Sequence, residues 1–145
     1  GETADPRHAG EIDVVSWSWG MDSPSDAFGN AVARTAFDQL HIVKQVDSAT
    51  TALMSALRNN ELIKKAVLTV RKAGKDPLEY IKITMKEVLV TAVSVGGSGG
   101  EDRLTENVTL NFAEFKFEYQ PQSAKGGKEG GAKIAAWDIS GNAAA

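Results

Sequence analysis

Cysteine is absent from this chain of 145 residues, and only two histidines are present. Without cysteine the chain can form no disulfide and carries no thiolate nucleophile or thiolate metal ligand. A small domain stapled by disulfides and a thiol enzyme are therefore excluded. The same absence fits a protein built in a reducing cytoplasm.

Long apolar runs and an excess of positive charge are also missing. No apolar run approaches the roughly 18 residues that a membrane helix needs, and the net charge is −3, whereas nucleic-acid-binding proteins usually carry a basic face. Residues 1–8 are polar and lack the apolar centre of a secretory signal peptide. We therefore expect no membrane insertion, no nucleic-acid partner and no signal peptide. The length predicts one domain over residues 1–145.

No group of residues forms a recognisable catalytic or ligand-binding motif. His8 and His41 stand alone, without a second metal ligand at a suitable spacing. The glycine-rich segments lack a phosphate-loop ending, and Gly97-Ser98-Gly99 does not lie on a strand-to-helix turn. We predict no catalytic residues, no metal ligands, no cofactor-binding residues and no cofactor. A hydrolase formed by distant Ser, His and Asp residues stays open as a third-ranked alternative.

The sequence does contain a prominent aromatic strand, predicted over residues 11–19, where polar and apolar residues alternate. Trp17 and Trp19 are two positions apart, so both indoles leave the same face of the strand. Such a pair supplies a large apolar area for the core or for a contact between subunits. Lining of an aromatic ligand pocket is the alternative interpretation.

The rest of the chain predicts a mainly β protein with one helix. Alternation and turn signals indicate an antiparallel barrel or sandwich. Apolar spacings of three and four residues predict the helix over 49–58, with Asp47-Ser48 as its N-cap and Asn59-Asn60 at its end. The further strands are predicted at 33–46, 66–72, 80–95, 104–119 and 134–139.

Two of these strands have irregular apolar patterns. Residues 88–95 place apolar groups on both faces, which predicts that both faces are covered, by the helix or by a neighbouring subunit. In the next strand, apolar residues occupy even positions up to Phe112 and odd positions from Phe115 onward. The buried face must therefore switch near Ala113-Glu114, through a bulge or a sharp bend.

The segment from Met21 to Asn30 is longer than a tight hairpin requires, and long loops in compact domains are often functional. Its apolar residues Met21 and Phe28 suggest that it docks on another surface. We take it as a candidate contact segment. Its candidate contact residues are Met21, Asp22, Ser23, Pro24 and Phe28.

Short matches along nearly the whole chain resemble the haemolysin-coregulated proteins of type VI secretion. The resemblance is carried by Gly1-Glu2, by His8-x-Gly10-Glu11-Ile12-Asp13-Val14-x-Ser16-Trp17-Ser18-Trp19-Gly20, by Val46-Asp47-x-Ala49 with Ala52-Leu53-Met54, by Ala66-Val67-Leu68-Thr69-x-Arg71-Lys72-Ala73-Gly74, by Glu106-x-Val108-x-Leu110-Asn111-Phe112, by Phe117-Glu118-Tyr119-x-Pro121-Gln122 and by Trp137-Asp138-Ile139. Each piece is weak alone, and together they are specific.

The resemblance implies a two-sheet antiparallel β-barrel with one flanking helix, without enzymatic activity. It also implies hexameric rings that stack into the inner tube of the type VI system, with spike and sheath proteins as partners. Within such a tube the segment from Met21 to Asn30 is our candidate ring-stacking loop. The protein would be cytoplasmic before assembly, then secreted by that system without a signal peptide, and would carry effector proteins in a polar lumen. A monomeric β-barrel that binds a small ligand is the alternative.

The resemblance also concerns the two ends of the chain. Family members usually have a short strand before the position of Gly1, so we expect that residues preceding Gly1 were trimmed or are unseen. Because the sequence ends at Ala145, we expect no C-terminal toxin domain of the kind that some members carry.

Overall fold

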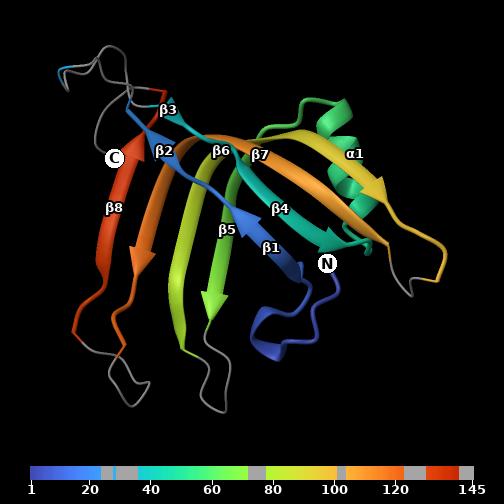
Figure 1. Ribbon diagram of the computed structural model, residues 1–145, viewed down its shortest axis with the longest axis horizontal. Helices are drawn as coiled ribbons and strands as arrows, with labels where there is room; N and C mark the ends of the chain where they lie inside the picture. The colour runs from blue at the N-terminus through green and yellow to red at the C-terminus, as the bar shows by residue number, and fades with distance from the viewer. Residues whose placement is uncertain (24–27, 29–35, 72–77, 101–103, 123–129, 141–145) are drawn as a thin grey trace. The chain divides into compact units, whose positions relative to one another are not determined.

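The computed structural model describes residues 1–23, 28, 36–71, 78–100, 104–122 and 130–140 (Figure 1). Strands dominate this part of the chain, with one α-helix and one 3-10 turn among the described residues. In chain order the elements are η1 (Pro6–His8), β1 (Val14–Ser18), β2 (Met21–Asp22), β3 (Ala36–Phe37), β4 (Leu40–Gln45), α1 (Thr50–Arg58), β5 (Ile63–Arg71), β6 (Glu79–Gly96), β7 (Thr105–Tyr119) and β8 (Lys133–Asp138).

The described strands form a six-stranded sheet and a separate two-stranded ribbon. The larger sheet has the order β1-β4-β7-β6-β5, and β8 pairs with β7; the ribbon is β2-β3. The predicted mainly β class, with antiparallel strands and one helix, is confirmed. Among the described residues, the strand path is open rather than closed into a barrel, because β1 and β5 are its two ends.

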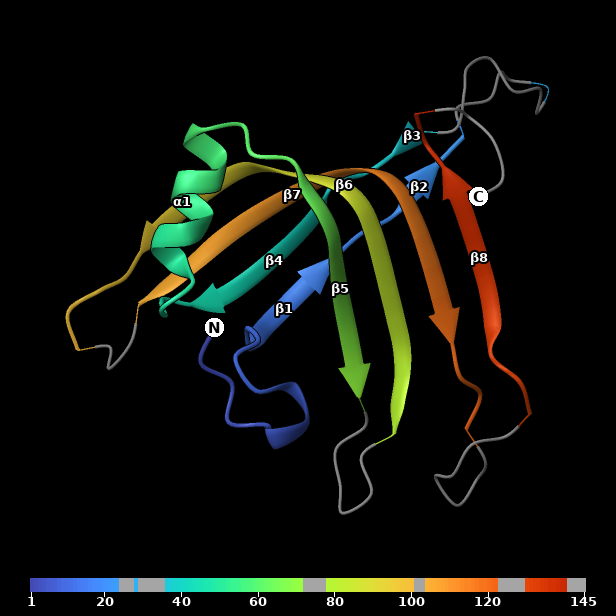
Figure 2. The ribbon, with the colours of Figure 1, turned by 180° about the vertical axis from the view of Figure 1, so that it is seen from behind.

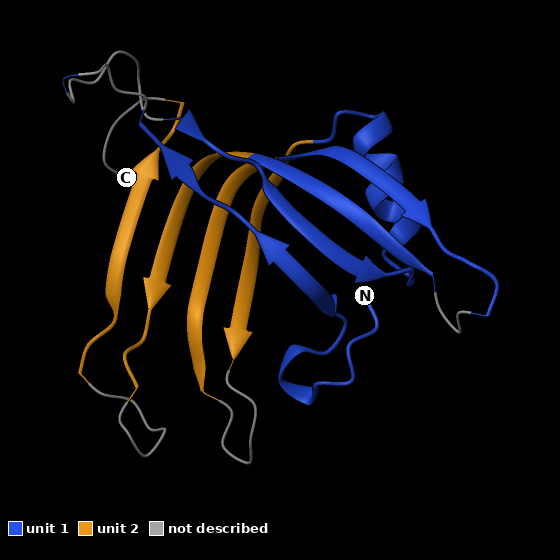
Figure 3. Cartoon of the chain, in the orientation of Figure 1, with its two compact units in different colours: residues 1–61, 89–111 blue, residues 62–88, 112–145 orange. Residues whose placement is uncertain are grey.

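The chain divides into two compact units (Figure 3). Unit 1 comprises residues 1–61 and 89–111, and unit 2 comprises residues 62–88 and 112–145. In unit 1, α1 lies against one face of β6 and β7 (Figures 1 and 2). That face is lined by the buried residues Leu40, Ile42, Val90 and Val108. The assignment of the whole chain to one domain stays a prediction.

Unit 2 contains β5, β8, the first part of β6 and the last part of β7. Its core is formed by Leu68, Ile83, Met85, Val88, Phe112 and Phe115, all of which are buried. On β5, Leu68 lies directly opposite Ile83 of β6. The alternation of side chains along the two strands therefore fixes which residues point to the core and which to the other face.

Both long strands reverse their buried face. In β7 the reversal falls between Phe112 and Phe115, which are both buried, as the sequence predicts. In β6, Met85 and Val88 are both buried, although they are three positions apart. Between them Glu87 has a φ of 55°, a left-handed conformation that is uncommon for a residue with a side chain.

Residues 88–95 differ in their exposure. Val88 and Val90 are buried within a single copy, whereas Val95 is 44% exposed. Cover of the second face by a neighbouring subunit stays a prediction.

The helix ends are close to the predicted ones. The helix begins at Thr50, and Asp47 Oδ1 accepts a hydrogen bond of 2.9 Å from the amide of Ala49. At the other end Asn60 has a φ of 49°, which Asn tolerates better than most residues. The N-cap is Ala49, which makes no side-chain capping bond, so the predicted cap at Asp47-Ser48 is one to two residues too early, although the Asp47 side chain does accept from the Ala49 amide.

Candidate functional site

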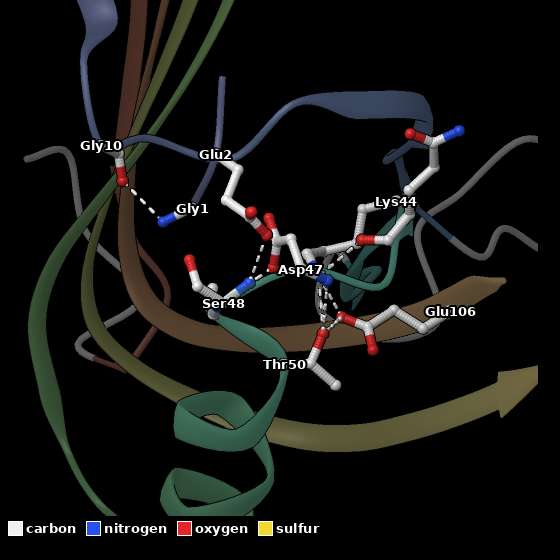
Figure 4. Close-up of polar contacts among 10 residues, drawn as sticks. Gly1, Glu2, Gly10, Lys44, Asp47, Ser48, Thr50 and Glu106 are labelled. Carbon is white, nitrogen blue, oxygen red and sulfur yellow. Dashed lines mark hydrogen bonds and ion pairs between the residues drawn. The ribbon is translucent and has the colours of Figure 1, made fainter. Parts of the chain in front are cut away.

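A buried ion cluster joins three elements of unit 1 (Figure 4). Lys44 on β4 and Glu106 on β7 lie directly opposite each other in the sheet, and both side chains are 0% exposed. Lys44 Nζ donates to Glu106 Oε1 and forms an ion pair of 2.9 Å with Asp47 Oδ1. Thr50, the first residue of α1, donates to Glu106 Oε1 over 3.1 Å.

The cluster places two carboxylates around one ammonium group. Burial by itself would raise the pKa of Asp47, but the hydrogen bond from Lys44, the bond from the Ala49 amide and the positive charge of Lys44 together hold it below its usual value of 3.8. Asp47 is therefore charged at neutral pH. Glu106 Oε2 is buried and has no hydrogen-bond partner among the described residues.

The same residues also begin the helix. Thr50 Oγ1 accepts a hydrogen bond of 3.0 Å from the amide of Asp47, while the Asp47 carboxylate accepts from Ala49. This reciprocal arrangement satisfies amides that a helix start leaves unpaired. Glu2 Oε2 accepts from the Ser48 amide over 2.7 Å (Figure 4), so the N-terminal segment is tied to the same point. The side chains of Lys44 and Glu106 are buried, and the cluster joins β4, β7 and the start of α1.

Sequence reasoning missed this cluster. The signal was the position of Lys44. It lies an even number of residues after Leu40 and Ile42, so its side chain leaves the same face of the strand as these apolar residues. A lysine at such a position is buried together with a partner, because an unpaired charge in a core is very costly. Glu106 occupies the equivalent position beside Val108 on β7.

The two tryptophans of the predicted aromatic strand have different surroundings. Trp17 lies opposite Ile42 in the β1–β4 pair and is half-buried, so it belongs to the face that also carries the core of unit 1. Trp19 lies one residue beyond β1 and donates its indole N–H to the carbonyl of Asp38 over 2.8 Å. Their assignment to the core or to a subunit contact remains a prediction.

The candidate ring-stacking loop begins with a short strand. Met21 and Asp22 form β2, whose Met21 side chain is 51% exposed, and Phe28 is 89% exposed. Ser23 follows β2 outside any described strand, and Pro24 lies outside the described residues. The structure thus places two large apolar side chains of this segment at the surface.

The face of β4 and β7 opposite the core is mostly polar, with Val43 as its apolar residue on β4. On β4 it carries His41 and Gln45, and on β7 it carries Asn107 and Thr109. His41 Nδ1 lies 3.1 Å from Thr109 Oγ1. The other histidine, His8, contacts Glu11 in the N-terminal segment. The two histidines therefore lie in separate polar contacts, and neither is brought to a second histidine.

Within the residues that the structure describes, no helix is long and apolar enough to cross a membrane.

Comparison with known proteins identifies relatives over most of the chain. The family described as "Type VI secretion system effector, Hcp" matches residues 1–119. Protein hcp1 of Pseudomonas aeruginosa strain PAO1 is 48% identical over 143 residues, which cover 96% of this chain and 88% of that protein.

Solved structures agree with this match. The crystal structure of Hcp1 from Salmonella typhimurium superimposes with a TM-score of 0.81 at 30% identity, covering 100% of this chain and 91% of that one. A structure described as a type six secretion system protein has a TM-score of 0.90 at 24% identity, covering 98% and 91% of the two chains. The latter likeness is one of fold alone.

The buried cluster predicts an acid-sensitive stability. The Asp47→Asn variant keeps an oxygen for the Ala49 amide but loses the charge. Because the pKa of Asp47 is lowered in the folded state, its carboxylate stabilises the fold fully above the unfolded pKa of about 3.9 and progressively less as the pH falls below it. We expect the wild type to unfold at higher urea than the variant at pH 7, and the difference to shrink toward pH 3.

Asp13→Asn is the matched control, since it removes one exposed carboxylate. A difference between the wild type and Asp47→Asn that stays constant from pH 7 to pH 3 would contradict the assigned role of the charge.

Proposed function

This chain belongs to the Hcp family of the type VI secretion system, and we propose that it is a ring-forming subunit of the inner tube. The family is one of secreted proteins of that system and is not an enzyme family. In the proposed function, hexameric rings stack into a tube. The spike and sheath proteins of the type VI system are its partners. The protein is cytoplasmic before assembly and is then exported by the system itself, without a signal peptide.

The observation that carries the proposal is the open strand path. Among the described residues, β1 and β5 end the path and β8 branches from β7, so each has a strand neighbour on one side only. A free strand edge presents N–H and C=O groups that pair readily with another chain. Different edges on one chain support a head-to-tail contact between copies, which closes into a ring when the rotation allows.

The polar face of β4 and β7 is our candidate for the lumen wall. It carries hydroxyl, amide and imidazole groups and one valine, Val43, and the helix lies on the opposite face of the sheet within unit 1. A wall without strong charge or apolar patches would let varied effector proteins pass without binding them tightly. We propose that carried effectors meet this face.

The segment from Met21 to Asn30 is our candidate for the contact between rings. The exposure of Met21 and Phe28 supports it, because large apolar side chains at a surface commonly mark a protein contact. Trp19 lies beside this segment, and its indole N–H joins the residue before Gly20 and β2 to Asp38, the residue after β3.

A mass measurement tests ring formation. Light scattering on the purified chain should give about six times the 15.4 kDa mass of one copy, and negative-stain microscopy should show six-fold rings. A monomer in both measurements would contradict the proposal. It would instead favour the small-ligand barrel that the sequence left open.

The lumen assignment is tested by labelling a single thiol. The chain has no cysteine, so the Asn107→Cys variant carries one reactive group. In tubes it should react with a small maleimide but only slowly with a maleimide on a large polymer, because the polymer is excluded from the lumen. In dissociated subunits both reagents should react. Equal rates of polymer labelling in tubes and subunits would overturn the assignment.

Deletion of residues 22–29 tests the stacking loop. Single rings should remain while tubes disappear, because the deletion removes the loop and leaves the strands of the larger sheet in place. The Met21→Ala/Phe28→Ala variant keeps the length of the loop and should weaken stacking less than the deletion. Electron microscopy counts rings and tubes, and undiminished tubes after the deletion would contradict the role.

A further inference from the structure

A row of polar residues crosses the sheet of unit 1, with His41 at its centre. Ser18 of β1 lies directly opposite His41 of β4, and Thr109 of β7 lies opposite His41 on the other side. The row continues to β6, where Thr91 Oγ1 donates to the main-chain carbonyl of Thr109 over 3.3 Å. We call Ser18, His41, Thr109 and Thr91 the imidazole row. It lies on the face that we propose as the lumen wall.

The imidazole of His41 is held at one of its two nitrogens. Its Nδ1 lies 3.1 Å from Thr109 Oγ1, and such a bond fixes the orientation of the ring. The side chain of Thr91 is engaged with Gln39 Oε1. His41 itself is exposed, and its Nε2 makes no hydrogen bond to the part of the chain that the structure describes. Nε2 is therefore available to a ligand.

No charged group on the strands of unit 1 shares this face with His41. β1 and residues 89–96 of β6 contain no Asp, Glu, Lys or Arg. In β4 and in residues 105–111 of β7 the charged residues are Lys44 and Glu106, which are buried on the other face and paired with each other. Asp38, three residues before His41, lies beside Gly20, since a Cβ placed there would be 3.5 Å from its Oδ2.

Protonation of His41 places a positive charge on an otherwise uncharged face. Imidazole groups change charge between about pH 8 and pH 5. In the charged ring both nitrogens donate, so Thr109 Oγ1 accepts from Nδ1 and its own hydroxyl proton is left for another acceptor. The charged Nε2–H and the neighbouring hydroxyl groups can then donate to one carboxylate, and hydrogen bonds between charged partners are the stronger kind.

We infer that the imidazole row binds acidic segments of carried effector proteins at low pH and releases them as the pH rises. The inference rests on the proposed function, because it names the partner and the regulation of the proposed lumen face. Each copy in a ring contributes one His41, so a segment with several carboxylates contacts several copies at once. At neutral pH the row is uncharged, and the wall holds such a segment only weakly.

An acidic protein segment fits this row better than other partners. A basic segment finds no carboxylate on the strands of this face and is repelled once His41 is charged. An apolar segment finds Val43 among hydroxyl, amide and imidazole groups. The net charge of −3 for the whole chain disfavours a long polyanion such as a nucleic acid, whereas a short run of carboxylates needs only the local charge.

Peptide binding to purified rings tests the inference. A fluorescent oligoglutamate peptide should bind wild-type rings about tenfold more tightly at pH 5.5 than at pH 7.5, because several exposed imidazoles gain charge together. The His41→Gln variant keeps a polar side chain without a charge and should lose most of this difference. The His41→Lys variant is charged at both pH values and should bind the peptide tightly at both. Fluorescence anisotropy measures the affinities.

The second histidine provides a matched control. The chain has two histidines, and His8 lies in the N-terminal segment in contact with Glu11. The His8→Gln variant should therefore keep the pH dependence of the wild type. It also assigns the two imidazole signals in an NMR spectrum, in which the peptide should shift the signal of His41 and not that of His8. This spectrum needs no change at His41, so it serves where His41→Gln forms no rings.

The outcomes distinguish this inference from the proposed function. A pH dependence that His41→Gln rings keep in full would overturn the inference and leave ring formation intact. A peptide that shifts the His8 signal, or neither signal, would overturn it as well. Equal gains in acid for an oligolysine peptide would show that charge on His41 is not the cause. Absence of rings in the wild type would instead refute the proposed function, and the imidazole row as a lumen site with it.

Discussion

The structure of unit 1 depends on one buried ion cluster in which Lys44 meets Glu106, Asp47 and Thr50. Two strands and the start of the helix converge there, although Lys44 and Glu106 are 62 positions apart in sequence. Removing charges from water costs several kcal/mol per ion, so the arrangement is favourable only when all partners are present in good geometry. The cluster thereby specifies which strand pairs with which, since a shifted register would leave these charges unpaired in the core.

Much of the fold follows from local patterns in the sequence. The helix was predictable because its apolar spacing, its Asp47 cap and its Asn60 terminus all agree. The reversal of β7 was predictable because Phe112 and Phe115 have opposite phase, and a strand has only two faces. The reversal of β6 was not predicted, because Glu87 gives no local sign of a left-handed backbone.

The candidate contact surfaces depend on pairings that one sequence does not reveal. The candidate lumen face exists only because the register of β4 with β7 places His41 opposite Thr109 and Val43 opposite Asn107. The sequence marked Met21, Asp22 and the tryptophans as notable residues, but it contained no signal that Trp19 would hold the far strand of the ribbon.

The two face reversals have a consequence for how the length of this protein can vary. Strands β6 and β7 belong to both units, and each changes its buried face next to the boundary between them. Insertion or deletion of a single residue in either strand would exchange core and surface positions for everything beyond it. Substitutions at exposed positions have no such effect. Related sequences are thus free to change length in the connections between strands, whereas these two strands must keep their residue count.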